Sequence, residues 1–287
     1  MPLPSPREAS EQLLGRAPDQ ISVLVAWPGH AAHRVEVGGA AFVVKVDADR
    51  DVVAREVAGH RRAARAGIPV PELVAAADHC LAVRFVEGTP LSEPASDSAW
   101  RAAGSVLSQV HGLAPGALIG DGFGSASATW PEFVEGLLTR ELEGCVRELG
   151  FDPDQGERIR GAFDDARSLI DQRVPVWCHG DCQPEHVLVD PRDDSVVAII
   201  DWADHGPADP AWDLAVLSLE DPARVGALLD GYGYGARAVD RGEVRTLLSL
   251  FGVLRWLGEA RWLAARSHPQ AAAALERATR WKSARSG

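Results

Sequence analysis

Two neighbouring stretches, residues 178–190 and 196–202, constrain the fold and the chemistry of this chain more than any others. The first places Asp181 in a loop before a short apolar run, and the second is an apolar run that leads to Asp201. Short apolar runs bounded by polar turns are typical of buried strands, so we expect two strands that present two carboxylates. This arrangement suits phosphoryl transfer from a nucleotide, in which one carboxylate orients the attacking hydroxyl and another holds the magnesium that bridges the phosphates.

The composition is that of a globular protein with a sizeable core. Of the 287 residues, 46% are apolar, which is enough for one unit of two lobes or for two domains. No window approaches the roughly 18 apolar residues of a membrane span, and the N-terminus has no apolar signal core. We therefore expect a cytoplasmic protein with reduced cysteines and no membrane partner. The net charge of −12 argues against a nucleic-acid partner, which would favour a basic face.

The first third of the chain has the pattern of a small antiparallel sheet with helices. Ser5-Pro6-Arg7-Glu8 is a capping box with proline at the first helical position, which predicts a short helix to residue 14. A longer helix is predicted over 49–66, before Gly67. Alternating apolar residues between turn signals predict strands over 21–25, 32–37, 41–46, 72–76 and 80–86.

Beyond Pro90 the pattern is mostly helical, apart from the strands that flank the two stretches described first. We place the boundary between an N-terminal lobe, residues 1–86, and a C-terminal lobe, residues 87–287. Residues 116–127 are rich in glycine, serine and alanine, which predicts a loop. Helices are predicted over 98–113, 131–149, 154–172, 210–219, 222–231, 241–265 and 269–282.

Lys45 lies on the apolar run 42–46. A lysine on such a strand can point its ammonium into a cleft and meet phosphate oxygens, although a lone strand lysine more often lies along the surface with its head in water. Two observations favour the cleft. Lysine is scarce in this chain, and Glu56 on the following helix is placed to pair with Lys45 and fix its rotamer.

The candidates around the two strands also have structural interpretations. Asp181, which follows His179-Gly180, can orient a hydroxyl or simply accept hydrogen bonds from turn amides. Asp201 can hold Mg²⁺ or cap a following helix. His186 can contact a phosphate, position Asp181 or be a satisfied core histidine, because imidazole is a poor magnesium ligand.

A soft-metal cluster is another interpretation of the same segment, because cysteine and histidine suit zinc. Its members would be Cys178, His179, Cys182 and His186. Their spacing matches no common zinc finger, and a strand is predicted directly through Val187. The cluster is therefore disfavoured.

Residues further along the chain are interpreted as structural. Asp209 is expected to cap a helix that has proline at its first position, and Asp213 to hydrogen-bond the backbone of the Asp181 loop. Trp256 and the adjacent Arg255 lie on the last helices. Tryptophans there either form a wall for a bulky substrate or pack the helical core.

In chain order these features are a strand lysine, a helix glutamate, a His-Gly-Asp loop and an Ile-Asp-Trp strand. This order resembles the aminoglycoside phosphotransferase-like kinases, relatives of the protein-kinase fold, over about residues 20–265. Residues 178–189, 199–202 and 208–214 are the most specific part of the match. The resemblance implies an α+β, bilobal protein-kinase-like fold with a small N-terminal antiparallel sheet plus helix and a larger, mostly helical C-terminal lobe.

The resemblance also implies an enzyme, a nucleotide-dependent O-phosphotransferase that phosphorylates a hydroxyl of a small molecule. ATP or GTP would be the donor and Mg²⁺ the cofactor. The acceptor would be an antibiotic of the macrolide, aminoglycoside or nucleoside type, and the reaction would give resistance or self-protection. The alternative is a catalytically weak kinase-like protein that binds a nucleotide or ligand, but the joint presence of Lys45, Glu56, Asp181 and Asp201 argues against it.

By position, the resemblance assigns nucleotide binding to the N-terminal lobe and catalysis and substrate binding to the C-terminal lobe. Lys45 would meet the α- and β-phosphates and Glu56 would hold it, while Gly29 and His30 would belong to the loop over the phosphates. The hinge that receives the purine base through its backbone would be formed by Arg84, Phe85, Val86 and Glu87.

In the C-terminal lobe, the resemblance makes Asp181 catalytic together with His179, and makes Asp201 and His186 the metal site. His186 departs from the family, which usually has asparagine there. Histidine at this point is similar to the macrolide phosphotransferases, which tend to favour GTP, and a capuramycin-type nucleoside-antibiotic phosphotransferase is another relative. The loop near Gly29 is poor in glycine, so the phosphates would be covered more loosely or by a differently shaped loop.

Overall fold

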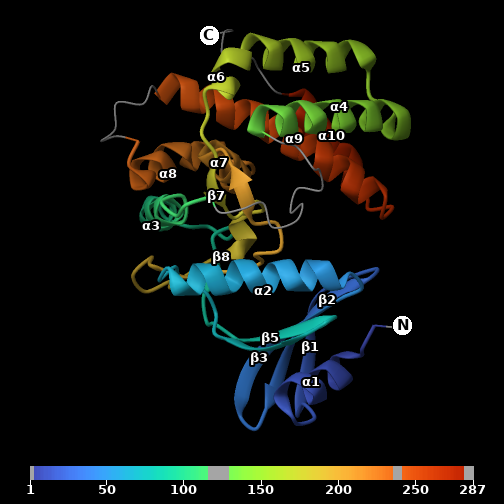
Figure 1. Ribbon diagram of the computed structural model, residues 1–287, viewed down its shortest axis with the longest axis vertical. Coiled ribbons are helices and arrows are strands. Elements are labelled where there is room, and N and C mark those ends of the chain that lie inside the picture. Colours follow the sequence, from blue (N-terminus) through green and yellow to red (C-terminus); the bar gives the residue numbers. More distant parts are fainter. Residues whose placement is uncertain (1–2, 116–128, 235–240, 281–287) are drawn as a thin grey trace.

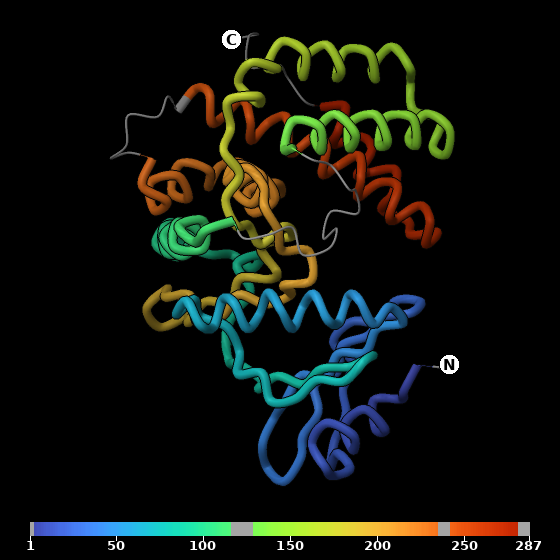
Figure 2. Tube along the Cα trace, viewed as in Figure 1, coloured from blue at the N-terminus to red at the C-terminus, as the bar shows by residue number. Residues whose placement is uncertain are grey.

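The computed structural model describes residues 3–115, 129–234 and 241–280, so the loop predicted at 116–127 lies outside the described residues. The chain forms two lobes stacked along its longest axis, with a sheet in one and mainly helices in the other (Figure 1). Figure 2 shows the N-terminal third of the chain, in blue, at one end and the C-terminal helices, in orange and red, in the opposite lobe. None of the described helices is long and apolar enough to span a membrane.

The N-terminal lobe is built on a five-stranded antiparallel sheet with the strand order β1-β2-β3-β5-β4. Tight turns at 28–29, 38–39 and 78–79 join sequential strands, as the sequence predicts. The bounds are β1 Gln20–Trp27, β2 His30–Val37, β3 Ala40–Asp47, β4 Leu73–Ala77 and β5 Cys80–Arg84. The last strand is shorter than the predicted 80–86, because the chain leaves the sheet after Arg84 toward the C-terminal lobe.

One helix covers each face of this sheet. Helix α1 (Pro6–Leu14) has the predicted capping box, and it packs on the face that carries Val44 and Val46 of β3. Helix α2 (Arg50–Arg65) packs on the opposite face, which carries Val43. Because side chains alternate along a strand, Lys45 shares the α2 face with Val43.

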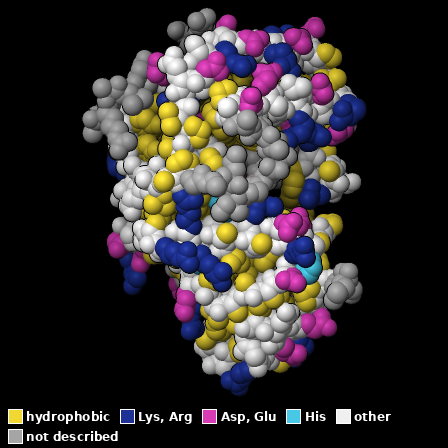
Figure 3. Space-filling view, in the orientation of Figure 1, with side chains coloured by type: hydrophobic (Ala, Val, Ile, Leu, Met, Phe, Trp, Pro, Cys, Tyr) yellow, Lys and Arg dark blue, Asp and Glu magenta, His cyan; other side chains and the backbone are white. Residues whose placement is uncertain are grey.

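Helix α2 is also the element that meets the C-terminal lobe. Val53, Glu56 and Val57 are buried at helical spacing, which directs Glu56 inward. A Cβ atom at Gly59 would lie 2.8 Å from the carbonyl oxygen of Trp202, so only glycine lets α2 approach the loop after Asp201 this closely. Arginine side chains gather on the surface over α2 (Figure 3).

The C-terminal lobe packs its helices around one large apolar core, in which α9 lies against α4, α7 and α10. Fully buried Leu107, Leu214 and Phe251 belong to this core. The helices are α3 Asp97–Val110, α4 Trp130–Leu149, α5 Pro153–Asp165, α6 Arg167–Asp171, α7 Pro210–Ser218, α8 Val225–Tyr232, α9 Arg241–Ala264 and α10 Ala271–Thr279.

Two predictions for this lobe need correction. The helix predicted over 154–172 is two helices, because the backbone leaves the helical region at Ala166, which has ψ of 4°. Alanine is a strong helix former and gives no sign of this break. The predicted helix over 222–231 begins with a 3-10 turn, η2 (Pro222–Arg224).

Small sheets in the C-terminal lobe hold the two motif stretches, residues 178–190 and 196–202. Strands β8 (Val187–Val189) and β9 (Val196–Ile199) form the predicted antiparallel pair, and β7 (Val176–Cys178) precedes them. Two further strands were not predicted: β6 (Thr89–Pro90) pairs with β8, and β10 (Gly206–Ala208) pairs with β7. Both are very short and contain proline, so their sequences carry no strand pattern.

Candidate functional site

The loop that carries Asp181 is fastened by Asp213 in the first turn of α7. Asp213 Oδ2 accepts a hydrogen bond from the His179 amide at 2.7 Å, and Oδ1 accepts one from the Gly180 amide at 2.8 Å. Gly180 has φ of +90°, and a Cβ atom there would lie 2.0 Å from the Asp204 carbonyl oxygen. The predicted hydrogen bonds between Asp213 and the backbone of this loop are confirmed.

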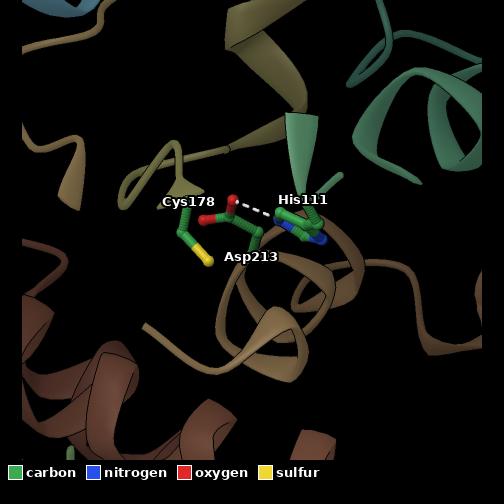
Figure 4. Close-up of side chains that lie close together, drawn as sticks. All are labelled: His111, Cys178 and Asp213. Carbon is green, nitrogen blue, oxygen red and sulfur yellow. Dashed lines mark hydrogen bonds and ion pairs between the residues drawn. The ribbon is translucent and has the colours of Figure 1, made fainter. Parts of the chain in front are cut away.

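A buried hydrogen-bond network supports Asp213 (Figure 4). His111 Nε2 lies 2.9 Å from Asp213 Oδ2, and His111 Nδ1 lies 2.9 Å from Tyr232 Oη. Cys178 lies beside this pair, donates to the Ala208 carbonyl oxygen at 3.5 Å, and has a pKa raised well above its ordinary value by burial. The potential ligand atoms of these side chains lie within 4.8 Å of one another. Since the thiol keeps its proton and both Asp213 oxygens accept hydrogen bonds, hydrogen bonding accounts for this cluster.

His179 connects the Asp181 loop to the end of β9. Its Nε2 lies 2.9 Å from the Ile200 carbonyl oxygen, and its Nδ1 accepts a hydrogen bond from the Asp181 amide at 3.3 Å. The side chain is fully buried, and burial lowers the pKa of the imidazole. Both ring nitrogens are thus engaged within the protein.

The soft-metal cluster considered from the sequence is not assembled. Burial raises the pKa of the Cys182 thiol well above its ordinary value, which disfavours the thiolate that a soft metal binds. His179 and His186 each direct a ring nitrogen to a backbone carbonyl oxygen instead. Among the described side chains, these four do not form a common group of ligand atoms.

Asp181 is held by two donors from different elements. Gln183 Nε2 lies 3.1 and 3.0 Å from the two carboxylate oxygens, and Arg255 Nη2 of α9 lies 3.1 Å from Oδ1. Burial alone would raise the pKa of Asp181, but the charges of Arg255 and His186 outweigh it and hold the pKa below its ordinary value. The group is therefore an ionised carboxylate that can accept a hydrogen bond from a hydroxyl.

Asp201 follows β9 in the left-handed backbone region, with φ of +66°. Lys45 Nζ lies 3.2 Å from its Oδ1, and His186 Nε2 lies 3.6 Å from its Oδ2. Burial would raise the pKa of Asp201, but Lys45 and His186 lower it far below the ordinary value. The helix-cap interpretation of Asp201 is wrong, because Asp209 caps the next helix by accepting from the Ala211 amide.

Lys45 is buried at the boundary between the lobes, with only 12% of its side chain exposed. Its Nζ lies 2.6 Å from Glu56 Oε1, so the predicted ion pair is present. Burial would lower the pKa of Lys45, but the carboxylates of Asp201 and Glu56 raise it above its ordinary value. The surface-lysine interpretation is therefore wrong.

His186 lies between the two aspartates. Its Nδ1 lies 2.7 Å from the Asp181 carbonyl oxygen, so Nδ1 carries the hydrogen of that bond. In the neutral ring, Nε2 then presents a lone pair toward Asp201 Oδ2 at 3.6 Å. A metal ion bound at this point would have the His186 nitrogen and an Asp201 oxygen as neighbours.

A cavity of about 470 Å³, which we call the interlobe cavity, opens beside these groups. His186 and Asp201 line it from the C-terminal lobe, and most of its other walls are apolar. Gly29 and Glu87, two of the residues predicted to bind nucleotide, do not line it. The predicted nucleotide-binding residues that do line it are His30, Lys45, Glu56, Arg84, Phe85 and Val86.

The β1–β2 hairpin reaches the C-terminal lobe at its turn. Trp27 makes an edge-to-face contact with Trp262 of α9, with ring centroids 5.2 Å apart, and also contacts His268. On the other side of the turn, His30 Nδ1 lies 2.9 Å from Asp47 Oδ2. The turn itself contains Gly29, which has φ of +84°.

A second cavity of about 160 Å³, the helical-lobe cavity, lies against α9 and α10. Gln183 and Arg255, the two donors to Asp181, both line it. Glu185 lines this cavity and the interlobe cavity. Asp181 therefore stands between a cavity shared by the lobes and a cavity of the helical lobe.

Sequence reasoning does not connect three residues with this site, although it notes Arg255 on the last helices. Arg255 is far from Asp181 in the sequence, and His111 lies in an ordinary helical pattern. Asp204 follows the Asp201 loop, and its pKa is raised to about 7 by burial and by the charges of Asp181 and Asp201. None of these residues belongs to a motif that would have identified it.

Comparison with known protein families identifies a family for this chain. The family model described as phosphotransferase enzyme family matches residues 26–247. Among solved structures, an aminoglycoside-3'-phosphotransferase of type VIII is 27% identical, with 85% of this chain and 97% of that chain covered and a TM-score of 0.62. No curated protein sequence matches the chain.

Two further solved structures share the fold. A putative fructosamine-3-kinase from Thermobifida fusca is 22% identical, with 96% of this chain and 99% of that chain covered and a TM-score of 0.73. A macrolide 2'-phosphotransferase from Brachybacterium faecium is 20% identical, with 94% and 96% covered and a TM-score of 0.65. The predicted bilobal fold is therefore confirmed.

Proposed function

Because this chain belongs to the phosphotransferase enzyme family and is a small-molecule kinase, we propose that it transfers a phosphoryl group from ATP or GTP to a hydroxyl of an antibiotic of the macrolide, aminoglycoside or nucleoside type. Such a reaction would give resistance or self-protection. The observation that carries the proposal is the convergence of Asp181 and Asp201 on His186, with Lys45 at 3.2 Å from Asp201.

The interlobe cavity is the proposed nucleotide site. The base would lie against its apolar walls and meet the backbone of the hinge at 84–87, between lobes that we place at residues 1–86 and 87–287. Lys45, held by Glu56, would meet the phosphates. The turn at 29–30 would cover them, although Gly29 itself does not line the cavity.

The metal site is proposed at Asp201 and His186. The ionised carboxylate of Asp201 is a hard oxygen donor that suits Mg²⁺, and the Nε2 lone pair of His186 faces it. Asp201 and His186 would hold Mg²⁺ there, and the ion would supply positive charge to offset the negative charge of the phosphates. The His186 ring lies between the two aspartates, with Nδ1 3.8 Å from Asp181 Oδ2 and Nε2 3.6 Å from Asp201 Oδ2.

The acceptor would bind in the helical-lobe cavity, with its hydroxyl at Asp181. Asp181 would accept the hydrogen bond of that hydroxyl and orient its oxygen for attack. Gln183 and Arg255 would set the direction of the carboxylate. His179, which we expect to be catalytic, would act through position, since both of its ring nitrogens hold backbone groups.

The alternative, a catalytically weak binding protein, is less well supported. Two observations favour it: the turn at 28–30 is poor in glycine, and residue 186 is a histidine. Against it stands Asp181, whose carboxylate is held by Gln183 and Arg255. Nucleotide binding alone uses Lys45, Glu56 and Asp201 and does not require this second carboxylate.

A nucleotide-consumption screen tests the proposal. The purified chain is incubated with Mg²⁺ and macrolide, aminoglycoside and nucleoside antibiotics, with ATP and GTP in parallel, and products are identified by mass spectrometry. We expect acceptor-dependent consumption and a product heavier by one phosphoryl group, both lost in Asp181→Asn. Nucleotide binding with no acceptor-dependent turnover across the screen would favour the alternative instead.

A further inference from the structure

A third cavity, which we call the arginine groove, lies on the C-terminal lobe beside the helical-lobe cavity. Its volume is about 330 Å³, and it is lined by the end of α7, the turn before α8, α9, and the end of α10. On α9 the lining residues are 245, 248, 249, 252, 253 and 256. This spacing places one continuous face of the helix along the groove.

The charge of this groove is opposite to that of the chain. The net charge of the protein is −12, yet the charged side chains among the described residues that line the groove are all arginines: Arg245, Arg277 and Arg280. A guanidinium group stays charged and pairs well with planar carboxylates and with phosphates. The groove therefore attracts an anion.

The three guanidinium groups are available to a ligand. Arg245 is exposed and has no ion-pair partner among the described residues. Arg277 lies 3.1 Å from Glu220, and Arg280 lies 2.6 Å from Glu276, with at least half of each side chain exposed. Exposed pairs of this kind contribute only about 0–1 kcal/mol, so an incoming anion can compete with them.

The floor of the groove is apolar. Leu248 and Val253 are buried beneath it, and the Trp256 ring forms part of its wall. Gly252 contributes no side chain, and a Cβ atom there would lie 3.2 Å from Leu219 Cδ1. The absent side chain keeps the groove open for an apolar body.

The arginine groove and the helical-lobe cavity share three lining residues, Leu219, Trp256 and Arg277. The Arg277 guanidinium carbon lies 4.5 Å from the centroid of the Trp256 ring, so this pair stands between the two cavities. We propose that the arginine groove binds an apolar arm that carries an anionic group, a carboxylate or a phosphate, and that this arm belongs to the phosphoryl acceptor. Among the proposed acceptor classes this points to an acidic acceptor of the nucleoside type and away from the cationic aminoglycosides and macrolides. The claim that the arm belongs to the acceptor, which is the second part of the proposal, rests on the proposed function. The claim that the groove binds an apolar anion, which is the first part, does not.

Calorimetry on the full-length chain tests the groove without any turnover. The probes are octanoate, octyl phosphate, octan-1-ol and octylammonium, which share one alkyl chain and differ in charge. We expect the two anions to bind with one site per chain, and the neutral and cationic probes to bind at least about tenfold more weakly. Equal affinity for all four probes would overturn the proposal.

Variants separate this groove from any other site. Arg245→Glu is expected to weaken both anions at least about tenfold, and Arg245→Lys to retain part of the affinity. Gly252→Leu fills the groove and should weaken all probes. The control is Arg158→Glu on the exposed face of α5, which makes the same change in net charge and should leave binding unchanged. Anion binding that survives Arg245→Glu would contradict the assignment.

Steady-state inhibition tests whether the arm belongs to the acceptor. With an acceptor identified by the screen, octanoate should compete with that acceptor and not with the nucleotide. Inhibition that is not competitive with the acceptor would overturn the second part of the proposal. If no acceptor is turned over, the proposed function fails, and the calorimetry still decides whether the groove binds anions.

Discussion

Lys45 Nζ lies 3.2 Å from Asp201 Oδ1. This contact joins β3, the middle strand of the N-terminal sheet, to the loop after β9 in the other lobe. The same ammonium lies 2.6 Å from Glu56 of α2. One lysine thus connects a strand, a helix and the proposed metal-binding carboxylate. Because this cluster lines the interlobe cavity, it is placed to meet the phosphates of a nucleotide.

The first prediction concerns Lys45. Lys45→Met keeps an unbranched side chain that is one atom shorter and removes its charge, so the developing charge on the phosphates loses a fixed partner. We expect turnover to fall by about 100- to 1000-fold, as for removal of one preorganised electrostatic group. The control is Arg65→Met at the exposed end of α2. Comparable turnover in the two variants would contradict the role of Lys45, provided that circular dichroism shows both to be folded.

The second prediction concerns Asp213. Its two oxygens accept from the His179 and Gly180 amides, and an asparagine has one oxygen for both. Asp213→Asn therefore leaves one buried backbone N–H group facing the NH₂ group of the asparagine, with no acceptor. We expect the free energy of unfolding, measured by urea denaturation, to fall by about 1–3 kcal/mol. Asp164→Asn on the exposed face of α5 is the control. A stability equal to that of the control would show that this network does not hold the loop.

Much of the fold follows from local patterns in the sequence. The turns between strands, the capping box at Ser5 and the alternation that buries Val44 and turns Lys45 to the other face are all short-range features. They depend on neighbours in the chain, and so they are readable from it. The break at Ala166 is not, because alanine imposes no backbone conformation there and only packing decides.

The candidate site likewise has a part that local sequence predicts and a part that it does not. Asp181, Asp201 and their loops belong to a compact motif, so their proximity was predictable. The contact of Arg255 with Asp181 and the support of Asp213 by His111 join elements distant in sequence. Such contacts depend on how helices pack, and no local residue pattern predicts them.

The third prediction concerns the contact between Trp27 and Trp262. An edge-to-face aromatic pair contributes about 0.5–1.5 kcal/mol beyond its buried area. A double-mutant cycle on the free energy of unfolding with Trp27→Ala and Trp262→Ala should give a coupling of this size. The matched cycle of Trp27→Ala with Trp256→Ala should give none. Additive effects in both cycles would mean that the hairpin and α9 are not coupled.

The fourth prediction concerns pH. Burial, with the charges of Asp181 and Asp201, raises the pKa of Asp204 to about 7 from its ordinary value of 3.8. Between these two pH values the folded state binds more protons than the unfolded state, so this group lowers stability as pH rises through that window. Asp204→Asn removes the effect. Melting temperatures measured from pH 4.5 to 8 should fall less steeply in the variant, and parallel curves would contradict the assignment.

The most direct test of the account is the rate of transfer of a labelled γ-phosphoryl group to the acceptor found in the screen, compared between the native chain and Asp181→Asn. The Asp164→Asn variant serves as control, and nucleotide affinity is measured alongside. We predict that Asp181→Asn lowers kcat by about 100- to 10,000-fold while nucleotide affinity is retained, because this carboxylate acts on the hydroxyl rather than on the nucleotide. A rate for Asp181→Asn equal to that of the control would contradict the mechanism.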